Sequence, residues 1–330
     1  MDRVMVTGGA GFIGSHLVER LLSQGLFVDI VDDLSTGRLA NLAYARAKWL
    51  GSLAFHQMDV RSASMIELTK RKRPSVIFHL AAQTDVTFSM DNPLEDVAVN
   101  LGGSLRILEA ALGASCSKVI FAASAAIYGD PPADLLPLDE SVSLDPISPY
   151  GASKRAVLDY LDIYRRNHDL EYTALVFANV YGPRQGCSRE SGVISTFMER
   201  ALAGRPCTIY GDGSQSRDFV HVDDVVDALV RSIDNGGGLV LNIGTSIETT
   251  IARLHEEIVH VTGSTLRPRL LPKREGEIQR SALSAVKAET QLGWHHFTSL
   301  SDGLMDLVDW YRSNPDEFVH RRINKASKEK

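Results

Sequence analysis

Residues 7–14 read Thr-Gly-Gly-Ala-Gly-Phe-Ile-Gly, and they stand between a short apolar run and a segment with helical periodicity. Gly9, Gly11 and Gly14 have the spacing G-x-G-x-x-G, and Gly8 gives a second, wider spacing with the last two. Glycine adopts backbone angles that a β-carbon forbids and allows a pyrophosphate to approach the chain closely. A helix after such a turn points its free N–H groups at phosphate charge. The stretch therefore predicts a strand, a phosphate-binding turn and a helix.

Outward from this turn, β-rich runs alternate with helical patterns over the first 125 residues or so. The strand-like runs are residues 4–6, 27–31, 53–55, 76–78 and 119–121, and helical periodicity covers 13–22 and 101–112. Apolar strands separated by amphipathic helices indicate a parallel sheet that is buried on both faces. With right-handed crossovers, the predicted fold class is α/β, a doubly wound Rossmann sheet.

The rest of the chain is less regular. Prolines between 131 and 149 predict a loop, and a helix is expected to begin near Ser148. Further strands are expected at 173–177, 208–210 and 239–243, and further helices at 193–202, 222–233 and 251–261. We expect a dinucleotide-binding domain over 1–180 and a smaller α+β substrate-binding domain over 181–330, with about 217–245 crossing back to the first.

Composition narrows the function classes. The chain has 330 residues, of which 44% are hydrophobic and 23% charged, and its formal net charge is −6. This balance is ordinary for a globular protein and gives no electrostatic footprint for nucleic acid or an anionic membrane. No apolar run approaches the roughly 18 residues of a membrane span. Three widely spaced cysteines, Cys116, Cys187 and Cys207, indicate neither a metal site nor a disulfide framework, so we expect reduced thiols and a cytoplasmic location.

The second predicted strand ends at Asp32, about 18 residues after Gly14, where dinucleotide-binding turns carry a carboxylate for the adenosine ribose. Such a carboxylate repels a 2′-phosphate, which favours NAD over NADP, although Arg38 lies nearby. Asp33 is either a second carboxylate at this site or a loop cap. The residues expected to bind NAD in this part of the chain are Gly8, Gly11, Phe12, Ile13, Gly14, Asp32 and Asp33.

A second constellation consists of Ser124, at the end of the fifth strand, and Tyr150 and Lys154 in Tyr-Gly-Ala-Ser-Lys. The spacing places the tyrosine and the lysine on one helix face, which by itself is common among packed and solvated side chains. In a doubly wound sheet, however, ligands bind outside the carboxyl ends of the strands.

Oxidation of a secondary alcohol needs a base, and a phenol with a pKa near 10 is a poor one at neutral pH. Lowering this pKa by about three units requires roughly 4 kcal/mol. A lysine charge about 5 Å away supplies on the order of 3 kcal/mol at an effective dielectric constant near 20. The positive nicotinamide of NAD⁺ would supply the rest. We therefore predict that Tyr150 is the base, that Lys154 lowers its pKa, and that Ser124 hydrogen-bonds the reacting oxygen.

With these motifs, the sequence resembles the extended short-chain dehydrogenases/reductases, and within them the UDP-glucose 4-epimerases, to about residue 312. The resemblance rests on T-G-G-A-G-F-I-G (7–14), H-L-A-A (79–82), S-A-A-I-Y-G (124–129), Y-G-A-S-K (150–154), N-V-Y-G-P-R-Q (179–185), I-Y-G-D-G-S-Q-S-R-D-F-V-H-V-D-D (209–224), N-I-G-T (242–245) and R-E-G-E (274–277). It implies NAD as a tightly held cofactor and a UDP-sugar as substrate. It also implies a homodimer through helical faces near residues 94–112 and 150–166.

The resemblance implies roles for further residues. On the cofactor side it places Asp59 and Val60 at the adenine, and Leu80, Ala81, Ala82 and Asn100 along the dinucleotide, together with Tyr150 and Lys154. On the substrate side it implies contacts from Ser124, Ala125, Tyr150, Asn179, Val193, Tyr210, Arg217, Arg274 and Glu277, with Tyr210 at the uracil and both arginines at the diphosphate. His79, on an apolar strand, is interpreted as a core histidine rather than a catalyst.

The reaction implied by the resemblance is redox-neutral: the sugar C4 is oxidised, the 4-keto sugar turns over on its diphosphate tether, and hydride returns to the other face. Related sugar 4,6-dehydratases carry an Asp-Glu pair after the active-site Ser/Thr, and UDP-glucuronate decarboxylases carry a Glu there. Here Ala125 and Ala126 follow Ser124, which favours 4-epimerisation.

The sugar remains open between glucose, N-acetylglucosamine and glucuronate forms. A small residue at Ser281 would leave room for an N-acetyl group. Arg184 or Arg189 would suit a C6 carboxylate, or is a solvated surface arginine. A non-catalytic NAD(P) sensor is a further alternative, but it predicts decay of the Ser/Tyr/Lys set, which is intact.

Overall fold

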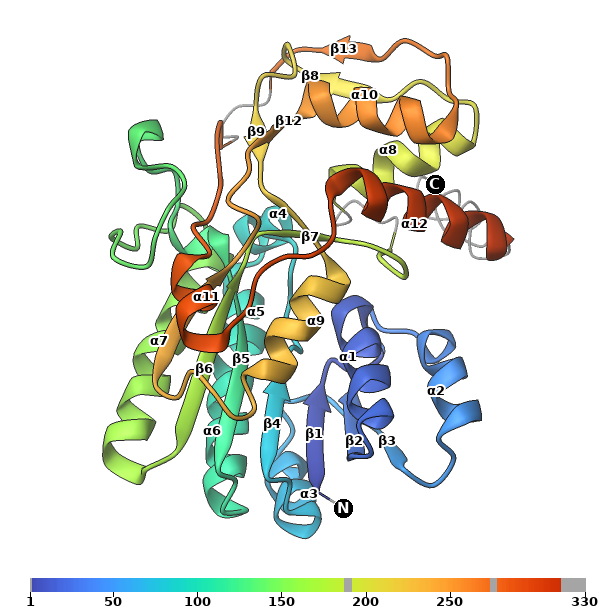
Figure 1. Cartoon of the computed structure of the whole chain (residues 1–330). Helices are drawn as coiled ribbons and strands as arrows, with labels where there is room; N and C mark the ends of the chain where they lie inside the picture. The colour runs from blue at the N-terminus through green and yellow to red at the C-terminus, as the bar shows by residue number, and fades with distance from the viewer. Residues whose placement is uncertain (1, 187–191, 274–277, 316–330) are drawn as a thin grey trace.

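The computed structural model describes residues 2–186, 192–273 and 278–315. Its largest feature is a seven-stranded sheet in the order β11-β6-β5-β4-β1-β2-β3, in which every neighbouring pair is parallel (Figure 1). The strands are β1 (Arg3–Thr7), β2 (Phe27–Asp32), β3 (Leu53–Gln57), β4 (Val76–His79), β5 (Lys118–Ser124), β6 (Glu171–Phe177) and β11 (Leu239–Ile243). The predicted doubly wound sheet is confirmed, and the five predicted N-terminal strands lie within β1 to β5.

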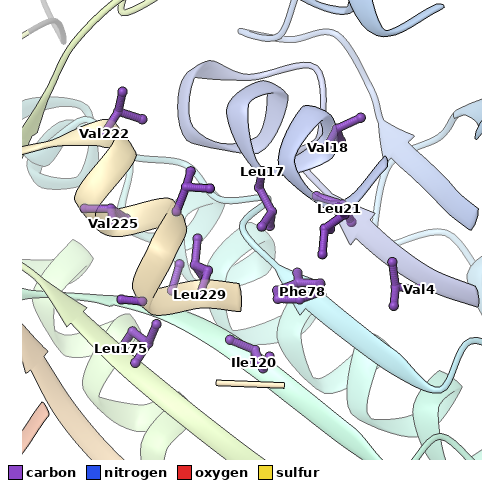
Figure 2. Packing of buried hydrophobic residues seen from close by; sticks show 14 of the residues in the cluster. Val4, Leu17, Val18, Leu21, Phe78, Ile120, Leu175, Val222, Val225 and Leu229 are labelled. Atoms are coloured by element: carbon purple, nitrogen blue, oxygen red, sulfur yellow. The ribbon is translucent and has the colours of Figure 1, made fainter. Parts of the chain in front are cut away.

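Helices cover both faces of this sheet. On one face lie α1 (Phe12–Ser23) and α9 (Val222–Arg231), and on the other lie α3 (Ser64–Lys72), α6 (Gly103–Gly113) and α7 (Pro149–His168). Alternate residues of each strand point to opposite faces, so Val4 packs beneath α1 whereas its neighbour Met5 belongs to the other core cluster. Figure 2 shows Leu17 and Leu21 of α1 facing the sheet beside α9. Burial on both faces explains why the strands are almost wholly apolar.

Much of the chain after β6 lies beyond the carboxyl ends of the main strands (Figure 1). Three pairs of short strands lie there: β7 (Asn179–Tyr181) with β10 (Phe219–His221), β8 (Thr208–Tyr210) with β13 (Arg269–Leu271), and β9 (Ser216–Arg217) with β12 (Thr249–Thr250). A third core cluster is made by α8 (Val193–Leu202), α10 (Ile251–Thr262) and α12 (Leu300–Ser313). α11 (Val286–Leu292) packs on the main sheet instead.

Several predicted boundaries shift by a few residues. The helix expected at 101–112 begins as α6 at Gly103, after α4 (Val86–Asp91), α5 (Pro93–Val97) and a π-helical turn (Ala98–Gly102). α2 (Ala43–Lys48), α11 and α12 lie outside the predicted elements. β11 joins the main sheet as an edge strand, although it follows the β8 to β10 segment in sequence. The two-domain division at about residue 180 stays a prediction.

Within the described ranges, the longest helices are too polar or too short to cross a membrane. Cys116 and Cys207 are buried free thiols, whereas Cys187 lies outside the described residues.

Candidate functional site

The predicted site residues of the first 180 positions meet at one edge of the sheet. Gly8 follows β1, Asp32 ends β2, Leu80 follows β4, and Ser124 ends β5. The strand order reverses between β1 and β4, because β2 lies on one side of β1 and β4 on the other. In open parallel sheets the carboxyl edge at such a reversal is where a ligand binds.

The glycine turn leaves no room for side chains at two positions. Gly8 has a φ of +71°, and a Cβ there would lie 2.7 Å from the backbone nitrogen of Ala81. A Cβ on Gly14 would clash with the carbonyl oxygen of Gly8. Gly11 is the N-cap of α1 and has no side-chain cap, so the N–H groups of Phe12 and Ile13 at the helix start point to the carboxyl edge of the sheet. This tight backbone cradle fits a pyrophosphate.

Asp32 is fixed beside the turn. Its two carboxylate oxygens accept hydrogen bonds from the backbone N–H of Ala10 (2.9 Å) and of Leu34 (2.8 Å), and burial raises the pKa of this carboxyl. Asp33 is exposed and accepts from the N–H of Ser35 at 2.9 Å, so it caps the loop after β2. The position of Asp32 at a strand end beside the glycine turn fits a ribose better than that of Asp33 does.

The predicted adenine-side residues lie after β3. Asp59 accepts from the guanidinium of Arg61 at 2.6 Å, and this hydrogen bond holds the pKa of the carboxyl below its ordinary value. Val60 is buried and packs against Gly103 at the start of α6. Leu80, Ala81 and Ala82, after β4, are only partly buried. The described structure therefore places these residues along the same edge as the glycine turn.

The Ser/Tyr/Lys set converges as the sequence predicts. Ser148 is the N-cap of α7 and accepts from the N–H of Gly151 at 3.1 Å, which fixes the start of this helix one turn before Lys154. Tyr150 and Lys154 are 9% and 4% exposed, and the hydroxyl of Ser124 hydrogen-bonds the Tyr150 phenol. The Lys154 ammonium donates to the carbonyl oxygen of Ala122 at 2.9 Å.

Burial dominates the electrostatics of Tyr150 and Lys154. Burial raises the pKa of Tyr150, against the opposing effect of the Ser124 hydrogen bond, whereas a lowering by Lys154 was predicted. Burial also lowers the pKa of Lys154 to about 8. The attraction of Lys154 does not include the cost of burying the phenolate, and the predicted lowering of the Tyr150 pKa also depends on the charge of bound NAD⁺, so it stays a prediction.

His79 and Asn100 are buried and make structural hydrogen bonds near the Ser/Tyr/Lys set. His79 is buried, and its ring nitrogens lie 2.7 Å from the Thr7 hydroxyl and 3.0 Å from the Ser104 hydroxyl. Burial lowers its pKa to about 3, so the ring is neutral, and its interpretation as a core histidine is confirmed. Asn100 exchanges hydrogen bonds with the backbone N–H (2.9 Å) and carbonyl (3.0 Å) of Gln83. Its amide thus fixes the segment after β4.

The predicted substrate-side residues lie on short strands and helix starts. Asn179 is exposed on β7, Val193 begins α8, Tyr210 ends β8, and Arg217 lies on β9. Arg274 and Glu277 lie outside the described residues, as does Arg189. Ala125 follows Ser124 in a short 3₁₀ turn (Ala125–Ile127).

Arg184 is largely buried. Its side chain is 18% exposed and donates to the Glu19 carboxylate of α1 at 2.7 Å. The interpretation as a solvated surface arginine is wrong for this residue. The ion pair ties the loop after β7 to the helix that follows the glycine turn.

Asp218, which is not among the predicted site residues, joins several segments around the predicted substrate-side residues. Asp218 is 1% exposed and accepts hydrogen bonds from Thr245 N (2.9 Å), Ser246 N (3.2 Å) and Leu283 N (3.2 Å). It thereby joins β9, the loop after β11 and the segment after Ser281. The only signal in the sequence was its place in the long motif at 209–224.

Comparison with known proteins gives one consistent result. Residues 4–244 match the sequence model of the NAD dependent epimerase/dehydratase family. A UDP-glucose 4-epimerase of Mycolicibacterium smegmatis is 44% identical over 313 residues, which are 94% of this chain and 99% of the relative.

Two solved structures extend this result. The UDP-glucose 4-epimerase of Thermotoga maritima, solved with UDP-glucose, has a TM-score of 0.91 and 39% identity, and the match covers 95% of this chain and 99% of that one. A UDP-N-acetylglucosamine 4-epimerase of Methanobrevibacter ruminantium has a TM-score of 0.89 and 34% identity over the same shares of the two chains. Relatives named for two different UDP-sugars thus share this architecture over almost its full length.

Proposed function

Because this chain belongs to the NAD-dependent epimerase/dehydratase family, we propose that it inverts the C4 carbinol centre of a UDP-sugar and holds NAD as its cofactor. The observation that carries the proposal is the convergence of Ser124, Tyr150 and Lys154 at the carboxyl edge of the sheet, next to the glycine turn. UDP-glucose and UDP-galactose are the proposed pair of substrates, because UDP-glucose 4-epimerases stand among the most similar relatives.

The residues present fit NAD. The backbone around Gly8, Gly11 and Gly14 would hold its pyrophosphate, and Asp32 would accept from its adenosine ribose hydroxyls. A buried carboxylate at this place repels a 2′-phosphate, which supports NAD over NADP. NAD would supply the hydride acceptor and donor for the sugar C4, and its positive charge would favour the phenolate form of Tyr150.

The protein's own groups handle the proton. Tyr150 takes the proton of the sugar 4-hydroxyl, and Ser124, which is already hydrogen-bonded to the phenol, contacts the same oxygen. Lys154, one turn along α7 from Tyr150, is positively charged below its pKa of about 8. After the 4-keto sugar has turned about its diphosphate, Tyr150 gives the proton back to the oxygen at C4. Asn179, Tyr210 and Arg217 are proposed to hold the nucleotide during this turn.

The residues after Ser124 favour epimerisation over elimination or decarboxylation. Ala125 and Ala126 occupy the 3₁₀ turn that leaves β5, and neither carries an acid or a base. A second proton abstraction from the keto sugar has no group at this turn to perform it. The intact Ser/Tyr/Lys set argues equally against a sensor that lacks chemistry.

The test is turnover of three substrates by the NAD-loaded enzyme. Incubation with UDP-glucose, UDP-N-acetylglucosamine or UDP-glucuronate, followed by NMR, should show the 4-epimer of UDP-glucose without net formation of NADH. A 4-epimer of only one of the other two sugars would move the proposal to that sugar. Stoichiometric NADH in solution would contradict epimerisation and indicate a dehydrogenase, and absence of any turnover would favour the sensor.

We also propose a homodimer. Apolar side chains are exposed along the helices before and after β5: Met90, Leu94, Val97, Tyr160 and Ile163. Leu94 is 86% exposed, which is costly for an apolar side chain unless a second copy covers it. Leu94→Glu should convert a dimer into a monomer in light scattering, and an unchanged mass would contradict this interface.

The free thiols of Cys116 and Cys207 support the expected cytoplasmic location.

A further inference from the structure

We infer that Asp96 is a positioning residue for the Tyr150 and Lys154 pair: it joins the catalytic helix α7 to the segment after β4, and its charge acts on both residues. This inference rests on the proposed function, because the roles of Tyr150 and Lys154 belong to that proposal. No sequence motif singled out Asp96, which lies on the short helix α5 four residues before Asn100.

The carboxylate of Asp96 is fully buried and fully engaged. One oxygen accepts from the Ser153 hydroxyl at 2.6 Å, and Ser153 stands between Tyr150 and Lys154 on α7. The other oxygen accepts from the side-chain amides of Asn100 and Gln83, both at 3.0 Å. A buried carboxylate with three donors resists displacement, because each lost partner would leave a buried polar group unsatisfied.

These partners connect the elements that surround the reacting groups. Gln83 lies directly after Ala81 and Ala82, and Asn100 lies in the π-helical turn between α5 and α6. A π-helical turn inside a helix commonly marks a functional site. The backbone N–H of Tyr150 donates to the Ser89 hydroxyl of α4 at 3.2 Å, which adds a second link from the same helical segment to α7. The network therefore sets the distance between the catalytic helix and the cofactor edge.

The charge of Asp96 is not neutralised by an ion pair within residues 2–186, 192–273 and 278–315. Its negative field raises the pKa of Tyr150 and that of Lys154. His79 of β4 also interacts electrostatically with Lys154, but it is neutral because burial lowers its pKa to about 3. Asp96 is thus the one carboxylate, among the described residues, whose charge raises the pKa of both members of the pair.

The test is the pH profile of kcat for Asp96→Asn in the NAD-loaded enzyme. Turnover needs Tyr150 without its proton and Lys154 with its own, so the pKa values of these two residues together set the two limbs of the wild-type profile. Asparagine removes the negative charge that raises both pKa values, so both limbs of the profile should move to lower pH, each by about one unit. At the wild-type optimum kcat should fall by roughly 10- to 100-fold, with KM changed by less than about twofold.

Two variants separate this role from a general loss of structure. Asp29→Asn removes another buried carboxylate, which lies on β2 and pairs with Arg3 of β1 and His56 of β3. It should lower stability without moving either limb of the pH profile. Ser153→Ala keeps the charge of Asp96 but removes its 2.6 Å link to α7, and should lower kcat by about three- to tenfold with both limbs in place.

Several results would overturn the inference. Limbs that stay at their wild-type pH in Asp96→Asn would remove the electrostatic role, and kcat within twofold of wild type would remove the positioning role. If Asp96→Asn does not fold, an unchanged kcat in Ser153→Ala would still contradict positioning. Failure of the proposed function would be visible earlier, as a wild-type enzyme that converts none of the three UDP-sugars.

Discussion

On the proposed catalytic side of the site, Ser124, Tyr150 and Lys154 stand at the end of a seven-residue strand and in the first turns of a 20-residue helix. On the proposed substrate side, Asn179 and Arg217 stand on strands of three and two residues, each paired with one other short strand. The first group is held by regular elements buried on the main sheet. The second is held by hydrogen bonds between loops.

This difference in support suits the two tasks proposed for the site, which are proton transfer and binding of the rest of the substrate. Groups that transfer a proton must stay within hydrogen-bond reach of one oxygen, and a buried helix on a sheet provides that precision. Groups that hold the rest of a substrate can be rebuilt from loops while the chemistry is kept. In this chain Asp218 joins several of these loops, whereas the proposed catalytic residues are held by a buried layer of helices on the main sheet.

Removal of the Tyr150 hydroxyl should have the largest effect on kcat and should leave NAD binding unchanged. Tyr150→Phe keeps the packed ring but deletes the base, so kcat should fall by at least about 10³-fold. The protein should still purify with NAD, because the glycine turn and Asp32 are untouched. Epimer formation by NMR and NAD released on denaturation measure the two effects. Full activity of this variant would rule out the proposed mechanism.

Gly14→Ala tests whether NAD binding depends on the tight packing of the glycine turn. A Cβ at this position would clash with the carbonyl oxygen of Gly8, so the turn must open. We expect NAD affinity to fall by about 100-fold and the free energy of unfolding by about 2 kcal/mol or more. Titration calorimetry and urea unfolding give the two values.

The control for this variant is Gly263→Ala. Gly263 has a φ of +71° with open space around its Cβ position, so alanine there should cost about 1 kcal/mol and leave NAD affinity unchanged. Equal losses of NAD affinity in both variants would mean that the glycine turn has no special fit to the cofactor.

The two sides also differ in how far the sequence predicts them. The continuous apolar strands, the glycine turn and the Tyr150–Lys154 spacing are patterns among a few neighbouring residues, so they can be recognised without knowing the fold. Asp96 and Asp218 cannot be found this way, because Ser153 lies 57 residues from the first and Leu283 lies 65 residues from the second. Nothing near either residue in the chain indicates its partners.

The pKa values of the site residues are also beyond what the sequence alone can predict. The attraction between a phenolate and a lysine can be estimated from an assumed distance, but burial cannot be known before the fold. In this structure burial dominates both groups: it raises the pKa of Tyr150 and lowers that of Lys154. The ion pair of Arg184 is equally hidden in the sequence, because its partner Glu19 is 165 residues away in the chain.

Asp218→Ala should disturb the substrate side and spare the catalytic side. It leaves the buried N–H groups of Thr245, Ser246 and Leu283 without their acceptor, so the free energy of unfolding should fall by about 3 kcal/mol. KM should rise by roughly tenfold, with kcat lowered by less than about threefold. Steady-state kinetics and urea unfolding measure these changes.

Asp212→Ala is the matched control. Asp212 also accepts from a backbone N–H, that of Ser214 at 2.9 Å, but it is exposed on the loop before β9. Its loss should change stability by about 0.5 kcal/mol or less and leave KM in place. If Asp218→Ala lowered kcat more than it raised KM, the two sides of the site would not be separable.

The smallest effect is expected at the start of the catalytic helix. Ser148→Ala removes the N-cap of α7, whose hydroxyl accepts from Gly151 N at 3.1 Å, and should cost about 1 kcal/mol of stability. The activity should fall by less than about threefold, because Tyr150 is also held through its N–H by Ser89 and through its hydroxyl by Ser124. Ser299→Ala removes the corresponding cap of α12 and should cost the same stability with no change in kcat. A much larger loss of activity in Ser148→Ala than in Ser299→Ala would mean that the catalytic side depends on the first turn of one helix rather than on the buried layer around it.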